Sequence, residues 1–472
     1  MGRAVRVRGL LLTAMLLLAL VTAMPGPDEA RPGTRPPKVR VDRTRHGFVD
    51  ASGRPFVPFG VSYYRPGTGW APQLWKQFDA EATRRDFAQL KKMGANVVRV
   101  FISFGSFFSE AHRLDADGLA KFDNLIDLAD EAGLYVHPTG PDHWEGMPAW
   151  TKGMDFFSTD ANDACLNALD DYWRMFATRY RGRTAIWAYD LRNEPSVAWD
   201  TPHMRTQWDA WRKEHGQEPV PVPDPKVQPP AAYLGDYQRF RESLAEKWVA
   251  RQARAIRAAD PDALVTVGLI QWSVPAQRIA LNQYAGFSPA AIAKYLDFMS
   301  LHFYPLVAGC YHYESADAET ANLAVLEAMA REAAKPGLPL VIAEFGWYGG
   351  GPLDAGGKPA TEEQQAEWCR HVVEVTSPIA CGWLNWGMYD HPEAKDVSRL
   401  TGLFTVDGKE KAWGRAFREL AERYRAKPPA YALPVRPDLP WGECIGSGEA
   451  MEKFRQAYLR AFLADRRSRS SP

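Results

Sequence analysis

Two textures alternate along the chain from about residue 47 onward. Short runs rich in β-branched and aromatic residues predict buried strands, and longer charged segments with apolar residues three and four positions apart predict amphipathic helices. In the segment 119–132, Leu119, Phe122 and Leu125 share one helical face, and Gly133 stands where a helix stop is expected. The predicted strands are Phe56–Tyr63, Asn96–Ile102, Tyr135–Pro138, Ile186–Leu191, Leu264–Leu269, Phe298–His302, Pro339–Glu344 and Cys381–Trp386. The predicted helices are 81–93, 119–132, 163–180, 235–259, 286–296, 317–334, 361–376 and 410–425.

The alternation of eight strands with eight helices is the count of a (β/α)8 TIM barrel, an α/β fold. An open, doubly wound sheet gives the same texture, but its nucleotide-binding forms carry Gly-rich phosphate loops. The sequence has no G-x-G-x-x-G after the first predicted strand and no G-x-x-x-x-G-K-[ST] at any position. We therefore predict the barrel, in a domain that spans residues 45–427.

Two segments fall outside the repeat. Residues 199–234 follow the fourth strand and include QEPVPVPDPKVQPP, with six prolines in 14 positions (217–230), which predicts an extended, stiff insertion. The insertion either walls one side of a cleft or is a surface excursion. Residues 428–472 predict an extension packed on the barrel, with a short helix over 449–465 and a disordered tail, RRSRSSP.

The first 44 residues predict export and a spacer. Three arginines at positions 3, 6 and 8 precede a 15-residue apolar run, 10–24, which is short for a membrane span and is typical of a secretory signal peptide over 1–23. An uncleaved N-terminal anchor is the alternative. The Pro-, Gly- and Arg-rich residues 24–44 predict a disordered linker. We expect a secreted or periplasmic protein without membrane contact after signal cleavage.

The composition limits the classes of molecule that the protein is expected to bind. The chain carries 57 Lys+Arg and 57 Asp+Glu, so its zero formal charge gives no electrostatic case for nucleic acid or an anionic membrane surface. Hydrophobic residues make up 46% and charged residues 24%, as in ordinary globular proteins. The 17 Trp, 18 Tyr and 22 Phe are unusually many: most of these rings must lie in the core, and some can line a cleft where their flat faces stack on a ligand.

The five cysteines show no C-x-x-C pair and no zinc-finger spacing, so no structural zinc site is expected. In an oxidising compartment one or two disulfides can form, and the odd count leaves at least one thiol unpaired within the chain. Their pairing stays open for Cys165, Cys310, Cys369, Cys381 and Cys444.

A barrel places functional residues at the carboxyl ends of its strands. Glu194, in Asn193-Glu194-Pro195, comes just after the fourth predicted strand, and Glu344 ends the seventh. A glutamate at the end of a buried strand is costly unless it is paired or used. Two glutamates that converge there suit hydrolysis of a glycosidic bond, in which one carboxylic acid protonates the leaving oxygen and the other attacks the sugar or activates water.

At these motifs the sequence resembles a known family. AYDLRNEP, HFYP, AEFGW and WLNWGMYD, in this order, are similar to the retaining glycoside hydrolases of the (β/α)8 clan, in particular glycoside hydrolase family 5, the cellulase and β-mannanase family. The likeness runs from about residue 45 to 425. It implies that Glu194 is the general acid/base, that Glu344 is the nucleophile and that Asn193 binds the sugar 2-hydroxyl.

The resemblance also assigns supporting residues. It implies that Arg99 keeps Glu344 ionised, that His302 and Tyr304 flank the nucleophile, and that Trp386 is the platform under the sugar. Each has a purely structural alternative: an interior ion pair for the arginine and core filling for the ring and the histidine. Weaker candidates for the cleft follow strands one, three and seven: Tyr63, Tyr64, Trp70, His143, Trp144 and Trp347. Asp142, Glu145 and Asp190 are competing acids, and Asp190 is expected to form a structural pair.

The predicted function is retaining hydrolysis of a β-1,4-mannan or β-1,4-glucan, with carboxyl groups ~5–5.5 Å apart and a raised pKa on the acid/base. An exo-acting β-mannosidase or β-galactosidase on the same barrel and a non-catalytic carbohydrate-binding barrel are the alternatives. The histidines are scattered without ligand spacing, so no metal and no cofactor are expected. The sugar, endo or exo action and the oligomeric state stay open.

Overall fold

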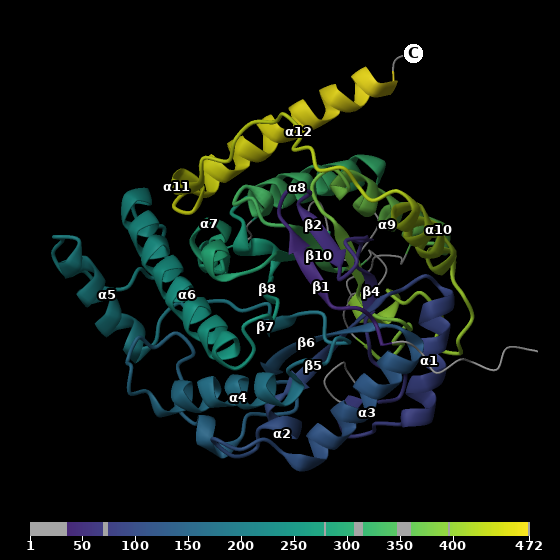
Figure 1. Ribbon diagram of the computed structural model, residues 1–472. Coiled ribbons are helices and arrows are strands. Elements are labelled where there is room, and N and C mark those ends of the chain that lie inside the picture. Colours follow the sequence, from purple (N-terminus) through teal and green to yellow (C-terminus); the bar gives the residue numbers. More distant parts are fainter. Residues whose placement is uncertain are drawn as a thin grey trace, which may run out of the picture. The chain divides into compact units, whose positions relative to one another are not determined.

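The computed structural model describes residues 35–68, 74–277, 280–305, 315–346, 360–394 and 397–470. Its centre is a closed barrel of eight parallel strands in the order β10-β11-β4-β5-β6-β7-β8-β9 (Figure 1). This confirms the predicted (β/α)8 fold and all eight predicted barrel strands. The barrel strands are β4 (Phe59–Ser62), β5 (Val97–Ser103), β6 (Tyr135–Asp142), β7 (Tyr189–Asn193), β8 (Val265–Leu269), β9 (Met299–Phe303), β10 (Leu340–Phe345) and β11 (Gly382–Asn385).

Helices cover the outside of the barrel, and side-chain caps define several of their starts. Asp79 accepts a hydrogen bond from the Ala82 N–H at the start of α1, and Thr361 and Gln364 form a capping box on α9. Gly133, at φ 65°, ends α3 in the left-handed conformation that the sequence predicts. The helices of the repeat are α1 (Ala80–Lys92), α3 (Ala116–Ala132), α4 (Ala164–Tyr180), α6 (Ala231–Ala259), α7 (Pro289–Ile292), α8 (Ala316–Ala334), α9 (Glu362–Thr376) and α10 (Ala412–Ala426).

One predicted helix, 286–296, and the predicted extended insertion, 199–234, differ from the structure. The expected helix 286–296 is only the four-residue α7 followed by a 3-10 turn, Ala293–Tyr295. The insertion 199–234 is not extended throughout, because α5 (Pro202–Glu214) forms at its start. Thr201 accepts a hydrogen bond from the Met204 N–H and a proline occupies the first turn of that helix, and the proline-rich stretch begins only after it ends.

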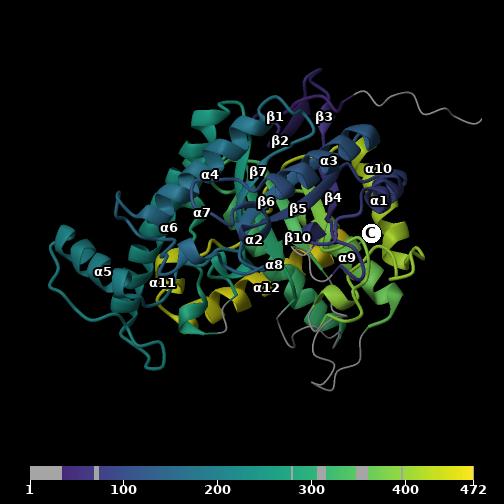
Figure 2. The ribbon, with the colours of Figure 1, turned by 90° about the horizontal axis from the view of Figure 1, so that it is seen from below.

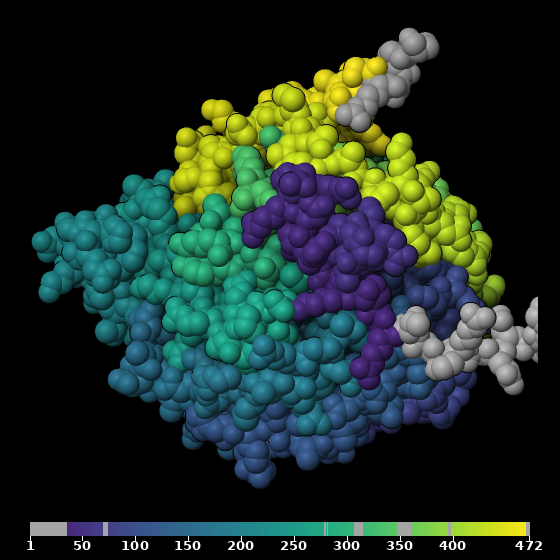
Figure 3. All heavy atoms as spheres, viewed as in Figure 1, coloured from purple at the N-terminus to yellow at the C-terminus, as the bar shows by residue number. Residues whose placement is uncertain are grey.

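A small antiparallel sheet closes the amino-terminal end of the barrel. It consists of β1 (Val39–Asp42), β2 (Gly47–Asp50) and β3 (Pro55–Phe56). Figure 2 shows this sheet at one end of the barrel, and in Figure 3 its residues are the purple atoms on the face toward the viewer. The Phe48 ring packs edge-on against Trp187, just before β7, and Phe298, just before β9, with ring centroids 5.3 Å apart in both pairs. The disordered linker predicted for 24–44 is therefore wrong at residues 39–42, where burial of apolar side chains stabilises a strand.

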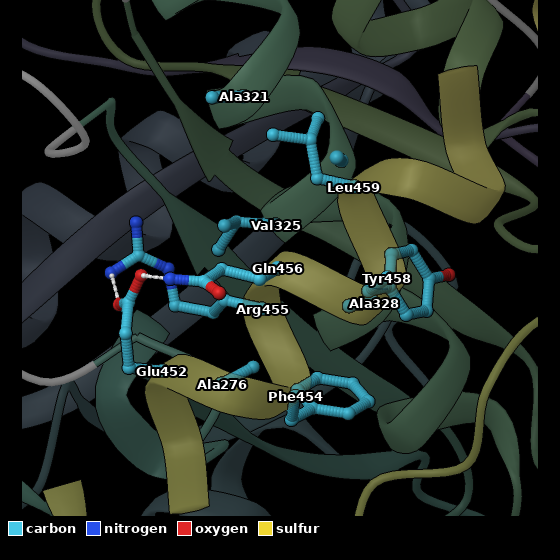
Figure 4. Close-up of a pocket in the computed structure, with 11 residues that line it drawn as sticks. Ala276, Ala321, Val325, Ala328, Glu452, Phe454, Arg455, Gln456, Tyr458 and Leu459 are labelled. Carbon is cyan, nitrogen blue, oxygen red and sulfur yellow. Dashed lines mark hydrogen bonds and ion pairs between the residues drawn. The ribbon is translucent and has the colours of Figure 1, made fainter. Parts of the chain in front are cut away.

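The carboxyl-terminal extension packs on two barrel helices: α12 (Gly448–Ser470) contacts α8, and α11 (Trp441–Cys444) contacts α6. Buried Glu327 of α8 accepts hydrogen bonds from Arg436 (2.7 Å) and from the hydroxyl of Tyr458 (3.0 Å). A cavity of about 60 Å³ lies between α8 and α12, next to the Glu452–Arg455 ion pair (Figure 4). The disordered tail expected from residue 466 is wrong up to Ser470, because the helix continues.

The predicted signal peptide, 1–23, lies outside the described residues, as does Cys310. Cys165, Cys369 and Cys381 hold free thiols. Within the described residues, no helix is both long enough and apolar enough to cross a membrane.

Candidate active site

Glu194 and Glu344 meet at the carboxyl-terminal end of the barrel, opposite the small sheet. Glu344 lies in β10, and Glu194 directly follows β7 in the left-handed region, at φ 47°, with its N–H bound to the Gly268 carbonyl at 2.9 Å. One oxygen of each carboxylate and one ring nitrogen of His302 lie within 4.8 Å of one another. The two carboxyl groups therefore lie close enough together to act on one glycosidic bond.

Arg99 of β5 is fully buried and ties the site together. Its guanidinium donates to Glu344 Oε2 at 2.8 Å, to Asn193 Oδ1 at 2.8 Å and to Asp190 Oδ2 at 3.2 Å. Asp190 also accepts hydrogen bonds from the Thr139 hydroxyl (3.0 Å) and the Gly268 N–H (2.7 Å). The structural pair predicted for Asp190 is therefore confirmed, and this saturated carboxylate holds the guanidinium that faces Glu344.

Replacing Arg99 by methionine should remove this cation while keeping much of its volume. Asp190 and Glu344 would then be buried without their shared partner, and we expect the free energy of unfolding to fall by about 3–5 kcal/mol. Urea denaturation measures the change. Arg84→Met is the matched control, because Arg84 pairs with Glu81 and Glu131 on the surface, and it should change the stability little. An equal loss of stability in both variants would contradict the expectation that the buried Arg99 ion pairs stabilise the fold more than the surface ion pairs of Arg84 do.

His302 and Tyr304 connect the two carboxylates. The Tyr304 hydroxyl donates to Glu344 Oε1 at 2.7 Å, and His302 Nδ1 lies 3.1 Å from Glu194 Oε1 and 3.5 Å from Glu344 Oε2. Burial lowers the pKa of His302 to about 4, so its ring is neutral at neutral pH. We assign its proton to Nδ1, which then donates to Glu194. A Cβ atom on Gly268 would lie 3.0 Å from the His302 ring, so glycine leaves room for this ring position.

The two glutamates have unequal surroundings. The pKa of Glu194 is raised to about 7, mainly by burial and also by the negative charge of Asp142, against the opposing effect of the Arg99 charge. Burial also raises the pKa of Glu344, against the effects of the Arg99 guanidinium and the Tyr304 hydroxyl. The prediction that Arg99 keeps Glu344 ionised did not include the effect of this burial on the pKa of Glu344. What distinguishes the pair is hydrogen bonding: Glu344 accepts two donors that favour its charge.

Trp386 lies beside the carboxylates but is largely covered, at 2% exposure. Its indole N–H donates to the Ser398 hydroxyl at 2.8 Å, and its ring packs against Tyr64 and Phe101 at centroid distances of 5.6 and 5.7 Å. Tyr304 packs on the same small cluster. The ring is therefore fixed beside Tyr304, whose hydroxyl binds Glu344.

The weaker candidates separate into three groups. Tyr63 is a core residue, fully buried, and its hydroxyl donates to Asp86 at 2.8 Å. His143 and Trp144 lie on the rim after β6, about half exposed, with their rings stacked at 4.5 Å. Trp70 and Trp347 lie outside the described residues.

Glu194, His302 and Glu344 are also the group whose donor atoms are close enough to hold a metal ion, among the described residues. A cation there would meet the Arg99 guanidinium, which already compensates Glu344 at 2.8 Å. The Arg99 and Tyr304 donors on Glu344 thus suit a hydrogen-bonded carboxylate better than they suit a metal ligand.

Sequence reasoning missed two positioning residues. Gln271 accepts a hydrogen bond from the Tyr304 N–H at 2.7 Å, and Ser398 holds the Trp386 indole. Gln271 follows β8 closely, so its place at the carboxyl end of a barrel strand was a signal that could have identified it. Ser398 lies in the 3-10 turn Val397–Arg399, and nothing in the sequence points to it.

Curated proteins with similar sequences are mannanases. Mannan endo-1,4-beta-mannosidase F of Aspergillus fumigatus is 25% identical over 203 residues, which are 39% of this chain and 46% of that protein. A probable mannan endo-1,4-beta-mannosidase A of Aspergillus flavus is 27% identical over 212 residues, 39% of this chain and 53% of that protein. The chain therefore spans about half the length of the curated relatives that it matches.

Solved structures share the fold over more of the chain. The exo-beta-1,4-mannosidase of Opitutaceae bacterium strain TAV5 gives a TM-score of 0.60 at 20% identity, over 82% of this chain and 62% of that one. The GH5_18 protein of Streptomyces cattleya, in complex with Manβ1-4GlcNAc, gives 0.62 at 20% identity, over 86% of this chain and 92% of that one. At this identity the likeness shows the fold alone.

The family itself is shown by a match of the sequence profile Cellulase (glycosyl hydrolase family 5) to residues 49–392. This range contains both glutamates and every barrel strand. The chain belongs to glycosyl hydrolase family 5.

Proposed function

We propose that the protein hydrolyses β-mannosidic bonds by a retaining double displacement, with Glu194 as acid/base and Glu344 as nucleophile. The observation that carries the proposal is that one carboxylate oxygen of Glu194 and one of Glu344 lie within 4.8 Å of each other. Glu344 accepts hydrogen bonds from two donors that stabilise its charge, while the pKa of Glu194 is about 7. The pair therefore has one member suited to attack and one suited to give a proton.

The reaction follows from these positions. Glu344 bonds to the anomeric carbon as the glycosidic C–O bond breaks, and Glu194 transfers its proton to the leaving oxygen. Water then attacks the glycosyl-enzyme, Glu194 takes a proton from it, and the sugar leaves Glu344. Asn193 accepts from Arg99 through Oδ1, which leaves its amide N–H groups to donate to the sugar 2-hydroxyl. The first product should have the β configuration, which proton NMR of fresh digests measures.

A β-mannoside is proposed as the substrate because the curated relatives carry that activity in their names. The zero formal charge of the chain agrees with an uncharged substrate. Internal cleavage of β-1,4-mannan is the first candidate. Removal of terminal mannose is the second, supported by the exo-beta-1,4-mannosidase and the Manβ1-4GlcNAc complex among the structural neighbours.

The test is a panel of β-1,4-mannan, manno-oligosaccharides, β-1,4-glucan, xylan and aryl β-glycosides, with product sizes resolved by chromatography. Oligomers of mixed length from mannan would support internal cleavage, and mannose alone would support the exo candidate. Cleavage of glucan or galactosides without any mannoside hydrolysis would overturn the substrate, and no hydrolysis of any β-glycoside would overturn the function.

The pH dependence should report Glu194. Its protonated form is the acid, and its pKa is about 7, so kcat/KM is expected to fall as pH rises through about 7. Initial rates on an aryl β-mannoside with a poor leaving group, from pH 4 to 9, measure this basic limb. The limb should disappear from the residual activity of Glu194→Gln. A limb that persists there at the same pH would contradict the assignment.

Export is part of the proposal, on the basis of the basic and apolar residues in 1–24. Amino-terminal sequencing of protein recovered from the medium or periplasm of its source cells should begin near residue 24. Retention of the intact protein inside the cell would contradict it.

A further inference from the structure

Asp142 ends β6 at the edge of the active site and has no part in the mechanism above. Its side chain is buried, at 1% exposure. Oδ1 accepts a hydrogen bond from the His143 backbone N–H at 2.7 Å and lies 2.9 Å from His143 Nδ1. Oδ2 is also buried, and within the described residues it meets no hydrogen-bond donor. A buried carboxylate with one unused oxygen is expensive to keep unless its charge has a use.

The strand register places Asp142 beside the acid/base. β6 and β7 are parallel neighbours, with Thr139 opposite Asp190. Asp142 is the last residue of β6 and Glu194 directly follows β7, so both residues lie at the carboxyl-terminal ends of neighbouring strands. The carboxyl groups of Asp142 and Glu194 therefore share one edge of the barrel mouth, and electrostatic repulsion from Asp142 contributes to the raised pKa of Glu194.

Other charged groups face Asp142 and are otherwise engaged. The Arg192 guanidinium lies 3.8 Å over the Phe156 ring and is attracted to Asp142 through space. Glu145, on the loop after β6, accepts hydrogen bonds from the hydroxyls of Ser103 and Ser106.

Glu194 itself is faced by groups from four strands. Arg99 of β5 donates through its two terminal nitrogens to Glu344, Asp190 and Asn193, and its charge lowers the pKa of Glu194. His302 of β9 is neutral and donates to Glu194, Tyr304 binds Glu344, and Glu344 of β10 is a second negative charge. Asp142 of β6 is thus a buried acid that faces Glu194 without belonging to the reacting pair.

We propose that Asp142 is a positioning residue that keeps Glu194 protonated until the leaving oxygen takes the proton. The inference rests on the proposed role of Glu194. In the first step the neighbouring negative charge opposes loss of the proton to solvent, and in the second step it favours return of a proton from water to Glu194. Asp142 itself contacts neither the anomeric carbon nor the leaving oxygen.

The test is Asp142→Asn, which keeps the shape of the side chain and removes its charge. With a poor aryl leaving group, the basic limb of kcat/KM should move down by about one pH unit, which is about a tenfold loss at pH 8 and little change at pH 5. Asp155→Asn is the matched control: Asp155 is also a buried carboxylate on the loop after β6, bound to the Phe157 N–H and the Thr201 hydroxyl. Its limb should stay in place.

A second substrate separates electrostatic tuning from damage to the fold. A 2,4-dinitrophenyl glycoside of the same sugar needs no proton on its leaving group, so its cleavage by Asp142→Asn should remain within about twofold of wild type. An unmoved limb, or an equal loss with both substrates at every pH, would overturn the proposal. Failure of the role of Glu194 would look different, because Glu194→Ala would then affect both substrates equally.

Discussion

Hydrolysis by Glu344→Ala is expected to fall by about 10⁵-fold or more, the scale of losing a covalent nucleophile in other enzymes. The carboxylate is the group that must displace the leaving oxygen, and neither Tyr304 nor Arg99, which hold it at 2.7 and 2.8 Å, can form that bond. Single-turnover rates on an activated aryl glycoside measure the loss.

Sodium azide makes this result specific. An azide ion fits the space left by the missing carboxylate and attacks from the same side, so Glu344→Ala should form a glycosyl azide of the α configuration. Glu242→Ala is the matched control, because this glutamate is bound to the Tyr284 and Trp441 side chains on another part of the barrel. It should retain activity within about tenfold and form no azide adduct. A β-glycosyl azide from Glu344→Ala would contradict its role as nucleophile.

Glu194→Ala is expected to lose about 10²–10⁴-fold of the rate on substrates with poor leaving groups. The proton on Glu194 is the one that the leaving oxygen needs, and the pKa of about 7 keeps it in place at neutral pH. On a dinitrophenyl glycoside the first step should be nearly intact, so the glycosyl-enzyme should accumulate as a burst followed by slow turnover.

Azide should rescue Glu194→Ala with the opposite stereochemistry. It attacks the glycosyl-enzyme from the side where Glu194 stood, so the product should be the β-glycosyl azide. Opposite azide configurations from the two variants would establish both roles in one comparison. The same configuration from both variants would mean that the two glutamates do not lie on opposite faces of the sugar.

The parts of the fold that repeat were predictable because their physics is local. Each barrel strand is a short β-branched or aromatic run, and each long helix has an apolar face and a stop such as Gly133. The pair Glu194 and Glu344 was predictable for a related reason: a carboxylate directly after an apolar run stands out in one dimension, and the barrel brings all such strand ends together.

Features that depend on contacts between distant segments were not predictable. Strand β1 forms because the small sheet covers rings such as Trp187 and Phe298, which lie more than 100 residues away. The fold places the Ser398 hydroxyl against the Trp386 indole, and Asp142 gains its proposed role from Glu194, which follows the neighbouring strand. Many of the described aromatic residues are buried in the core, and even Trp386 is only 2% exposed.

The left-handed backbone at Glu194, φ 47°, is a conformation that a side-chain-bearing residue adopts at an expense of about 1–3 kcal/mol. Glycine adopts it freely. Selection for thermal stability alone would therefore tend to replace Glu194 by glycine, which would stabilise the fold and abolish the activity in one substitution. A laboratory evolution experiment on this scaffold must screen for turnover at every round, because at this position robustness and catalysis favour different residues.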